Sequence, residues 1–184
     1  MTKTSPSLCI AVLEKTAFIK VPGRANFASS MDLKTVVNEL RDRGIGEFIL
    51  DLHDCVTMDS TFLGVLAGLV LRGGVQPGAE ARNIELLNPN PRVLELVENL
   101  GVLDYFRVKR EEVPSTLIFE ATENLPERSK EETTRNCLEA HQTLMNINPA
   151  NIPKFKEVTQ FMAEDLKKMS DNRKTDGEDK NGSK

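Results

Sequence analysis

Long apolar runs are absent from this chain of 184 residues. The longest run, around Phe62 to Leu71, is too short to span a bilayer. The chain starts MTKTSPSLCIAV, which is neither strongly cationic nor followed by the long apolar core and cleavage site of a secretory signal. We therefore expect a cytoplasmic protein with no direct membrane insertion.

An excess of basic residues is also missing. The formal net charge is −4, and no extended basic stripe offers the positive surface that a phosphate backbone requires. Nucleic acid is therefore a poor candidate partner. With an ordinary apolar share and 28% charged residues, the chain is long enough for one compact domain with an appendage, and protein partners are expected.

Cysteine pairs are lacking as well. The chain contains three cysteines, Cys9, Cys55 and Cys137, which are far apart and form no CxxC spacing. An odd number of separated cysteines indicates neither a disulfide framework nor a zinc site. We expect reduced thiols and no bound metal.

Glycines with the spacing of a phosphate-binding loop are not found. Gly64, Gly68, Gly73 and Gly74 match neither GxGxxG nor GxxxxGK[ST], so no nucleotide or other cofactor is predicted. Gly64 and Gly68 are four residues apart on one expected helix. We expect them to allow that helix to pack closely on a sheet.

One polar cluster suggests a metal site or a nucleophile, because Asp51, His53, Asp54 and Cys55 lie within five residues. Ligands from one loop, without a distant second pair, rarely form a closed metal site. The chain's other histidine, His141, is expected to be an ordinary surface or interface residue. A solvated loop at a strand end explains the cluster better, and no catalytic residue is predicted.

Hydrophobic periodicity predicts alternating strands and helices over residues 1–120. The expected elements are strands at Leu8–Leu13 and Ala17–Val21, a helix at Ser30–Arg43, a strand at Phe48–Leu52, a helix from Asp59-Ser60-Thr61 to Gly73, a strand at Asn83–Leu87, a helix at Pro91–Leu100, a turn and strand between Leu103 and Val108, and a strand at Thr116–Phe119. This order indicates an α/β domain with an antiparallel hairpin and parallel crossovers. The strand Phe48–Leu52 is expected to be covered by helices on both faces.

The pattern changes after Glu120. Glu127 to Met145 and Pro153 to Met169 are charged, helix-prone segments, which predict a helical extension over residues 121–170. Apolar residues recur three or four apart in the second segment, so it can cover the domain, the other helix or a second protomer in a homodimer. Residues 171–184 contain no aliphatic or aromatic side chain and are predicted to form a disordered, mobile tail.

The most informative segment is FILDLHDCVTMDSTFLGVLAGLVL, in which Asp59-Ser60-Thr61 start a helix after a buried strand. Helix capping by Asp59 or Ser60 accounts for these residue types and contributes about 1 kcal/mol. The helix start is also expected at the carboxyl edge of the sheet, accessible to solvent, where open α/β folds place their sites. A phosphoryl group on Ser60 would add about −1.5 to −2 charge there and oppose docking of an acidic or apolar partner without changing the fold.

These residues resemble the STAS domain, named for sulfate transporters and anti-sigma factor antagonists. The resemblance covers about Leu8 to Arg110. It is carried by Gly23-Arg24 before a helix, Asp51 near the end of the apolar strand, Asp59-Ser60-Thr61, Leu63-Gly64-Val65-Leu66 and Asn88-Pro89 before a third helix. The resemblance implies a STAS-like mixed sheet with helices packed on it. Phe62 departs from the family pattern, in which many members have glycine, and is expected to be a core anchor or an exposed partner contact.

In stand-alone bacterial members of this family, a kinase that is also an anti-sigma factor phosphorylates the hydroxyl residue after the aspartate. The unphosphorylated protein binds that kinase and frees the sigma factor. By position, the resemblance implies phosphorylation of Ser60, with Thr61 as the next hydroxyl. It also implies partner binding through Asp59, Ser60, Thr61, Phe62 and Leu63.

The resemblance thus implies a non-enzymatic anti-sigma factor antagonist or protein-interaction switch. Its expected partners are a kinase or anti-sigma factor and a phosphatase. The alternative is a constitutive STAS scaffold or a regulatory subunit of a signalling or membrane-transport complex.

Overall fold

The opening hairpin forms where the sequence predicts it. The computed structural model describes residues 7–74, 76–77, 83–122 and 125–178, with side chains as far as residue 171. In it, β1 (Cys9–Leu13) and β2 (Thr16–Lys20) pair in antiparallel register. Glu14 in the connecting turn has φ 55°, in the left-handed region that tight turns use.

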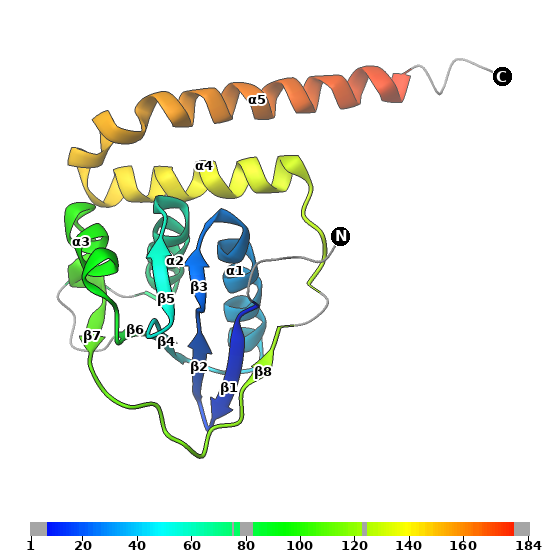
Figure 1. Cartoon of the computed structure of the whole chain (residues 1–184). Coiled ribbons are helices and arrows are strands. Elements are labelled where there is room, and N and C mark those ends of the chain that lie inside the picture. The colour runs from blue at the N-terminus through cyan, green and yellow to red at the C-terminus, as the bar shows by residue number, and fades with distance from the viewer. Residues whose placement is uncertain (1–6, 75, 78–82, 123–124, 179–184) are drawn as a thin grey trace.

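The hairpin belongs to a six-stranded mixed sheet in the order β7-β6-β4-β2-β1-β8. β4 (Glu47–Asp51), β6 (Ile84–Leu87) and β7 (Arg107–Lys109) extend β2 in parallel, whereas β8 (Glu120–Ala121) is antiparallel to β1. Parallel neighbours require crossovers, and the helices that follow the strands supply them. The predicted α/β fold class, a mixed sheet with helices packed on it, is confirmed (Figure 1).

Three strands depart from the prediction. Thr116–Phe119 is not a strand, and the two-residue β8 follows it instead. β3 (Gly23–Ala25) and β5 (Cys55–Met58) were not predicted, and they pair in parallel as a separate two-stranded sheet. The solvated loop expected after Asp51 is present as a short turn with His53 and Asp54 exposed, and Cys55, the last residue of the expected cluster, begins β5.

Helices cover β4 on one face only, which corrects the prediction for Phe48–Leu52. Phe48 and Leu50 are buried towards the helices, but Ile49 between them is partly exposed. On its own side, Ile49 borders a hollow whose walls include charged side chains from neighbouring strands. The crossover helices that the structure describes lie on the same face, so an apolar run of this length does not require two covered faces.

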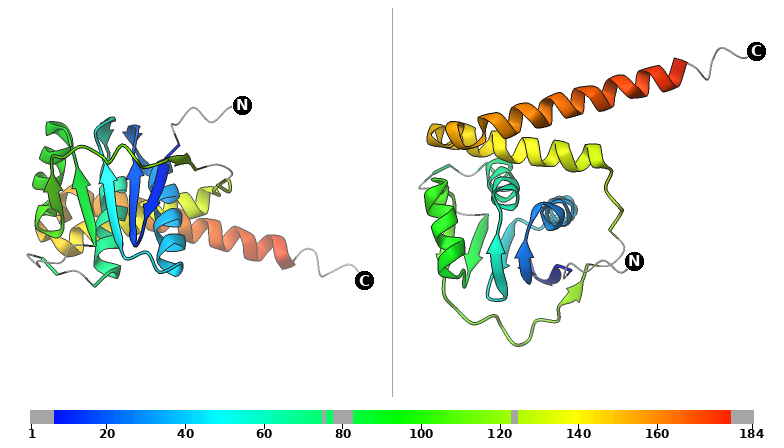
Figure 2. Two further views of the ribbon diagram at one scale, coloured as in Figure 1. Left: turned by 90° about the horizontal axis from the view of Figure 1, so that it is seen from below. Right: turned by 45° about the horizontal axis from the view of Figure 1, so that its top comes forward.

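Three helices follow strands along the chain: α1 (Phe27–Asp42), α2 (Ser60–Arg72) and α3 (Pro91–Asn99). α1 begins before the predicted Ser30 because Asn26 caps it, accepting hydrogen bonds from the first-turn amides. Figure 2 shows α1 and α2 between the sheet and the C-terminal helices.

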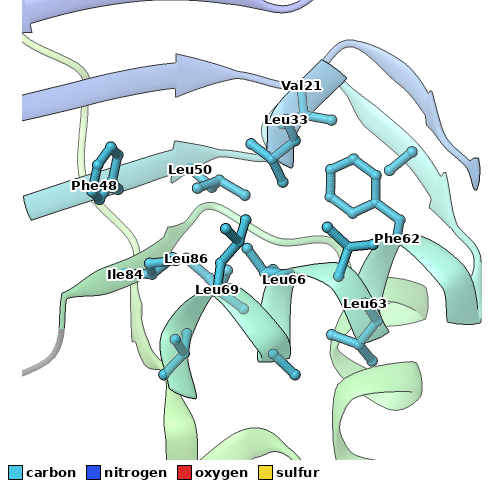
Figure 3. Packing of buried hydrophobic residues seen from close by; sticks show 14 of the residues in the cluster. Val21, Leu33, Phe48, Leu50, Phe62, Leu63, Leu66, Leu69, Ile84 and Leu86 are labelled. Carbon is cyan, nitrogen blue, oxygen red and sulfur yellow. The ribbon is translucent and has the colours of Figure 1, made fainter. Parts of the chain in front are cut away.

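The hydrophobic core fills the space between the sheet and these helices. Leu50 on β4 and Leu86 on β6 face Leu66 and Leu69 of α2 (Figure 3). Phe62 belongs to the same cluster and is 0% exposed. It is therefore a core anchor, one of the two roles that the sequence left open for it.

The C-terminal extension consists of α4 (Lys130–Ile147) and α5 (Ile152–Glu178), joined through a 3-10 turn at Pro149–Asn151. α4 lies across α2 and α1, and α5 packs on the outer side of α4 (Figures 1 and 2). Ala140 and Leu144 of α4 are members of the domain's core cluster. The extension therefore continues the core of the domain and does not stand apart from it.

Gly64 packs α2 against α4, not against the sheet as its spacing suggested. A Cβ atom at Gly64 would overlap the backbone carbonyl of Ala140. At Gly68, one turn further along α2, an added Cβ would lie 3.8 Å from the Thr143 Oγ1, an ordinary contact. The absent side chain at Gly64 thus lets the two helices approach closely.

The long helix α5 continues as far as Glu178, so residues 171–178 of the predicted tail are helical. Residues 179–184 lie outside the described residues, and the mobility of the tail stays a prediction. Along the part of the chain that the structure describes, no helix combines the length and apolarity needed to cross a membrane.

Candidate functional site

Asp59 holds the starts of two helices together. Its Oδ1 accepts a hydrogen bond from the backbone amide of Phe62 at 2.8 Å and so caps α2. Its Oδ2 accepts from the amide of Phe27, at the start of α1, at 2.9 Å. First-turn amides have no partner within their own helix, so each bond satisfies a donor that would otherwise be unpaired. The cap predicted here is present and serves both helices.

Ser60, the first residue of α2, contacts the C-terminal extension. Its Oγ lies 2.9 Å from Nε2 of His141 on α4; Ser60 is partly buried and His141 is buried. The helix start, predicted to face solvent, is therefore only partly exposed at Ser60. The reason is tertiary: α4 folds back over the start of α2, and the domain's own sequence does not show where α4 packs.

His141 is a buried residue, 6% exposed, and not an ordinary surface histidine. Its ring lies against that of Phe155 on α5, with centroids 4.7 Å apart. Burial lowers the pKa of His141, while the backbone of Cys137 and the carboxylate of Asp59 raise it. The neutral ring is therefore favoured, and a neutral Nε2 can accept a hydrogen bond from the Ser60 hydroxyl.

Thr61 lies deeper than Ser60, with 6% of its surface exposed. The thiol of Cys137 on α4 interacts with the Thr61 side chain. Burial raises the pKa of this thiol, the contact with Thr61 lowers it, and Asp59 raises it. Cys137 and His141 are one helical turn apart and so face the first turn of α2 together.

Polar contacts anchor α4 on α1. Asn136, which is 4% exposed, donates from Nδ2 to the Ser30 Oγ at 3.0 Å. One turn further along, Glu139 forms an ion pair with Lys34 at 2.9 Å. These contacts hold α4 across the helix layer, so that His141 lies over Ser60.

The junction between α4 and α5 is anchored on the end of α3. Asn151 is 0% exposed, and its Nδ2 donates to the carbonyls of Leu100 at 2.9 Å and Leu144 at 3.0 Å. The Leu144 carbonyl also accepts from the amide of Asn148, whereas the Leu100 carbonyl follows the end of α3, where carbonyls lack partners within the helix. The position of α4 is therefore fixed at both ends.

Two residues predicted to bind a partner lie in the core. Phe62 and Leu63 are each 0% exposed, so neither side chain offers a surface to a docked protein. Their role in binding a partner stays a prediction. Asp59, Ser60 and Thr61 do lie together at the start of α2, and their role in binding a partner stays a prediction.

Sequence reasoning missed Cys137 and His141 as neighbours of Ser60. The sequence of α2 nevertheless indicates that another segment packs on this helix, because Ser60–Leu71 contains no charged residue. A helix that is apolar all round is buried on all sides. The outer face of α2 therefore needs a cover, but α2 alone does not indicate which segment provides it.

The polar cluster after β4 makes local contacts. Asp51, which is 6% exposed, accepts through Oδ1 from the amide of His53 at 3.1 Å. The Cys55 thiol donates to the Thr57 carbonyl at 3.5 Å, and burial raises the pKa of this thiol. Among the described residues, no three candidate ligands are grouped so that they could hold a metal ion.

A serine hydroxyl next to a neutral imidazole is an arrangement that can activate the hydroxyl as a nucleophile. Ser60 and His141 have this geometry. Four hollows lie over the sheet, at the strand ends and beside α1 and α4, and Ser60 and His141 do not line these four.

The structure shows partial similarity to three solved structures. The anti-sigma factor antagonist SpoIIAA in its unphosphorylated form is 18% identical, with 56% of this chain and 88% of that chain covered and a TM-score of 0.47. The Bacillus cell fate determinant SpoIIAA in its phosphorylated form is 18% identical, with 56% and 91% covered and a TM-score of 0.44. A candidate anti-sigma factor antagonist from Thermotoga maritima is 15% identical, with 56% and 86% covered and a TM-score of 0.48.

No curated protein sequence matches the chain significantly. The family model described as the STAS domain matches residues 10–117, more than half of the chain. The matched segment includes the start of α2 and ends before β8, so α4 and α5 lie outside it. The chain belongs to the STAS domain family.

Proposed function

We propose that this chain is a phosphorylation-controlled protein-interaction switch. As an anti-sigma factor antagonist, it binds a partner kinase or anti-sigma factor while Ser60 is unphosphorylated, and a phosphatase restores that state. The observation that carries the proposal is the place of Ser60, at the first position of α2 directly after the capping Asp59, within a STAS domain. The protein acts by binding a partner and not by catalysis.

In the transfer step, the Ser60 Oγ forms a bond to the γ-phosphorus of ATP. The bond from that phosphorus to ADP breaks, and the hydroxyl proton passes to a base of the kinase. We propose Ser60 as the acceptor in preference to Thr61, because Thr61 is buried at 6% exposure whereas Ser60 is only partly buried.

The physical effect of the phosphoryl group is electrostatic. It adds about −1.5 to −2 charge at the start of α2, where the helix dipole favours an anion. The carboxylate of Asp59 lies beside it and already accepts two backbone hydrogen bonds. An acidic or apolar partner surface would then meet concentrated negative charge, so partner binding weakens while the domain keeps its fold.

Incubation of the full chain with ATP and candidate kinases from the same genome, followed by mass mapping, tests the acceptor. We expect a phosphoryl group on the Ser60 peptide, and none on that peptide in Ser60→Ala. Ser60→Asp should weaken partner binding by about tenfold or more, whereas Ser115→Asp on an exposed loop should not. Absence of modification, together with unchanged partner binding by Ser60→Asp, would reject the switch.

One observation favours a second function, a constitutive STAS scaffold or a regulatory subunit of a signalling or membrane-transport complex. The Ser60 hydroxyl is hydrogen-bonded to His141, and an acceptor that stays covered would never be modified. In that case partners would bind other surfaces, and Ser60→Asp would leave their affinity unchanged. The same binding measurement therefore separates the two functions.

A homodimer through the C-terminal helices also stays a prediction. Phe155, Val158 and Met162 are partly buried on α5, whereas Phe161 is 69% exposed. Sedimentation of the wild-type chain and of Phe161→Glu would check whether this surface joins two protomers.

A further inference from the structure

The helix α4 covers one side of the Ser60 hydroxyl. The Ser60 Oγ faces Nε2 of His141 at 2.9 Å, and the Phe155 ring lies against the histidine from the other side. A phosphoryl group adds a phosphorus and three oxygens to this Oγ. A phosphate anion also requires water or hydrogen-bond donors around its oxygens. Packing of α4 against it would exclude that water.

The contact between α2 and α4 is close beyond Ser60 as well. Ala140 packs its backbone directly on Gly64, so α4 cannot yield by a small shift towards α2. Room at Ser60 therefore requires α4 to move away from the domain. Because α5 packs on α4, the two helices would move as one hairpin, residues 130–178, here named the C-terminal hairpin.

The interface between this hairpin and the domain contains buried polar atoms without partners. Of the four buried side-chain atoms without a well-formed hydrogen bond among the described residues, three lie here: Arg128 Nε, Asn136 Oδ1 and His141 Nδ1, the last of which faces only the backbone of Cys137 on its own helix. Buried polar atoms that lack good partners reduce the net stability of a contact. The hairpin is thus held by a fully buried Leu144 but weakened by polar groups beside it.

We propose that the C-terminal hairpin gates Ser60: the docked hairpin and a phosphoryl group on Ser60 exclude each other. Two consequences follow from thermodynamic linkage. Release of the hairpin makes Ser60 accessible, and phosphorylation of Ser60 favours the released hairpin by the same factor. This inference rests on the proposed function for its physiological role, but the exclusion itself is testable without a kinase.

The first experiment measures access to position 60 in the full chain. The thiol introduced by Ser60→Cys is alkylated with N-ethylmaleimide, and its rate is followed by peptide mass mapping. Adding Gly64→Ala forces a Cβ into the Ala140 backbone and should raise the rate about tenfold or more. Adding Gly68→Ala, where an ordinary contact forms, is the matched control and should leave the rate unchanged. Equal rates in all three proteins would overturn the gate.

The second experiment tests the effect of the phosphoryl group. Phosphoserine is placed at position 60 by genetic code expansion, and the alkylation rate of the native Cys137 on α4 is measured. We expect an increase of about tenfold, since release uncovers this half-buried thiol. Phosphoserine at position 115, on an exposed loop, is the charge control. A rate that stays unchanged or falls would overturn the exclusion.

Cys55 reports unfolding in both experiments, because it is 2% exposed in the domain core. Hairpin release should leave Cys55 unreactive. If the protein used in one experiment reacts at Cys55, it is unfolded, and the gate is then tested by the other experiment. Failure of the proposed function is distinct from these outcomes: kinases would leave Ser60 unmodified even in Gly64→Ala, where the hairpin is released.

Discussion

At the scale of single residues, two side chains at the start of α2 have roles that tertiary contacts define. Asp59 reads as a helix cap in the sequence, but its second carboxylate oxygen also caps α1. His141 reads as a surface residue, but it is buried against Ser60. Each role leads to a measurement.

Replacing Asp59 should separate its two capping bonds. Asp59→Ala removes both acceptors and should lower the free energy of unfolding by about 2 kcal/mol, at about 1 kcal/mol for each cap. Asp59→Asn keeps one acceptor oxygen and should cost about half as much. Urea denaturation measures both values. Equal losses for the two variants would show that a single acceptor oxygen preserves neither cap.

Docking of α4 should depend on pH through His141. Burial lowers the pKa of His141 in the docked state, so His141 on the released helix, with a pKa of about 6.5, binds more protons. Docking is therefore strongest above that pH and weakens as the pH falls through about 6.5 towards the docked pKa. Amide hydrogen exchange of α4, corrected for its intrinsic pH dependence, should show protection falling from about pH 7.5 to about pH 5.5.

The groups that face His141 from each side set this response. Asp59 at the start of α2 and the backbone of Cys137 on α4 favour the protonated ring, whereas the Phe155 ring on α5 contributes no charge. His141→Gln should abolish the pH dependence of α4 protection. His53→Gln, which changes an exposed histidine, should preserve it. If His141→Gln kept the pH dependence and His53→Gln abolished it, the pH response would belong to another site.

At the scale of elements, the helix ends decide how the layers are joined. The amide of Asn151 links the end of α3 to the end of α4, and Asn26 and Asp59 cap the starts of α1 and α2. Helix interiors follow from apolar periodicity, but these end contacts bring separate elements into one arrangement.

Asn151→Ala should destabilise the junction of α3, α4 and α5. The substitution leaves the buried Leu100 carbonyl without this donor, which costs about 1–3 kcal/mol. Asn146→Ala, at an exposed position on α4, is the matched control and should change stability by less than about 0.5 kcal/mol. Thermal unfolding monitored by circular dichroism measures both. A similar effect of the two variants would remove the structural role of Asn151.

At the scale of the whole molecule, the C-terminal hairpin belongs to the domain's core. Ala140 and Leu144 of α4 pack with the buried residues of the sheet and of α2. The STAS match ends at residue 117, so the family segment and the cooperatively packed structure do not share the same boundary. A chain cut at the family boundary would expose the uncharged outer face of α2.

Deleting residues 127–184 should therefore lower the stability of the remaining domain by about 3 kcal/mol or more, from the loss of Leu144 and the exposure of α2. It should also increase binding of a dye that detects apolar surface. A chain ending at residue 170 is the control, because the segment removed has no aliphatic or aromatic side chain, and its stability should change by less than about 0.5 kcal/mol. Unchanged stability after the longer deletion would show that the hairpin is an independent appendage.

Local elements were predictable where one segment carries its own signal. The hairpin of β1 and β2, the end of α2 near Gly73 and the family resemblance at Asp59-Ser60-Thr61 all appear in short windows of sequence. β3 and β5 were missed because each is short and gains its hydrogen bonds from the other, far along the chain. Phe62 was left open because a helix start can face either solvent or core.

The sequence by itself determined the α/β class, the family and the hydroxyl at the start of α2, because apolar periodicity and capping residues act over a few neighbouring positions. Only the tertiary structure decided that His141 meets Ser60 and that Gly64 admits Ala140. The physical reason is separation: these partners lie more than 70 residues apart along the chain, and packing of α4 on an uncharged helix face brings them together.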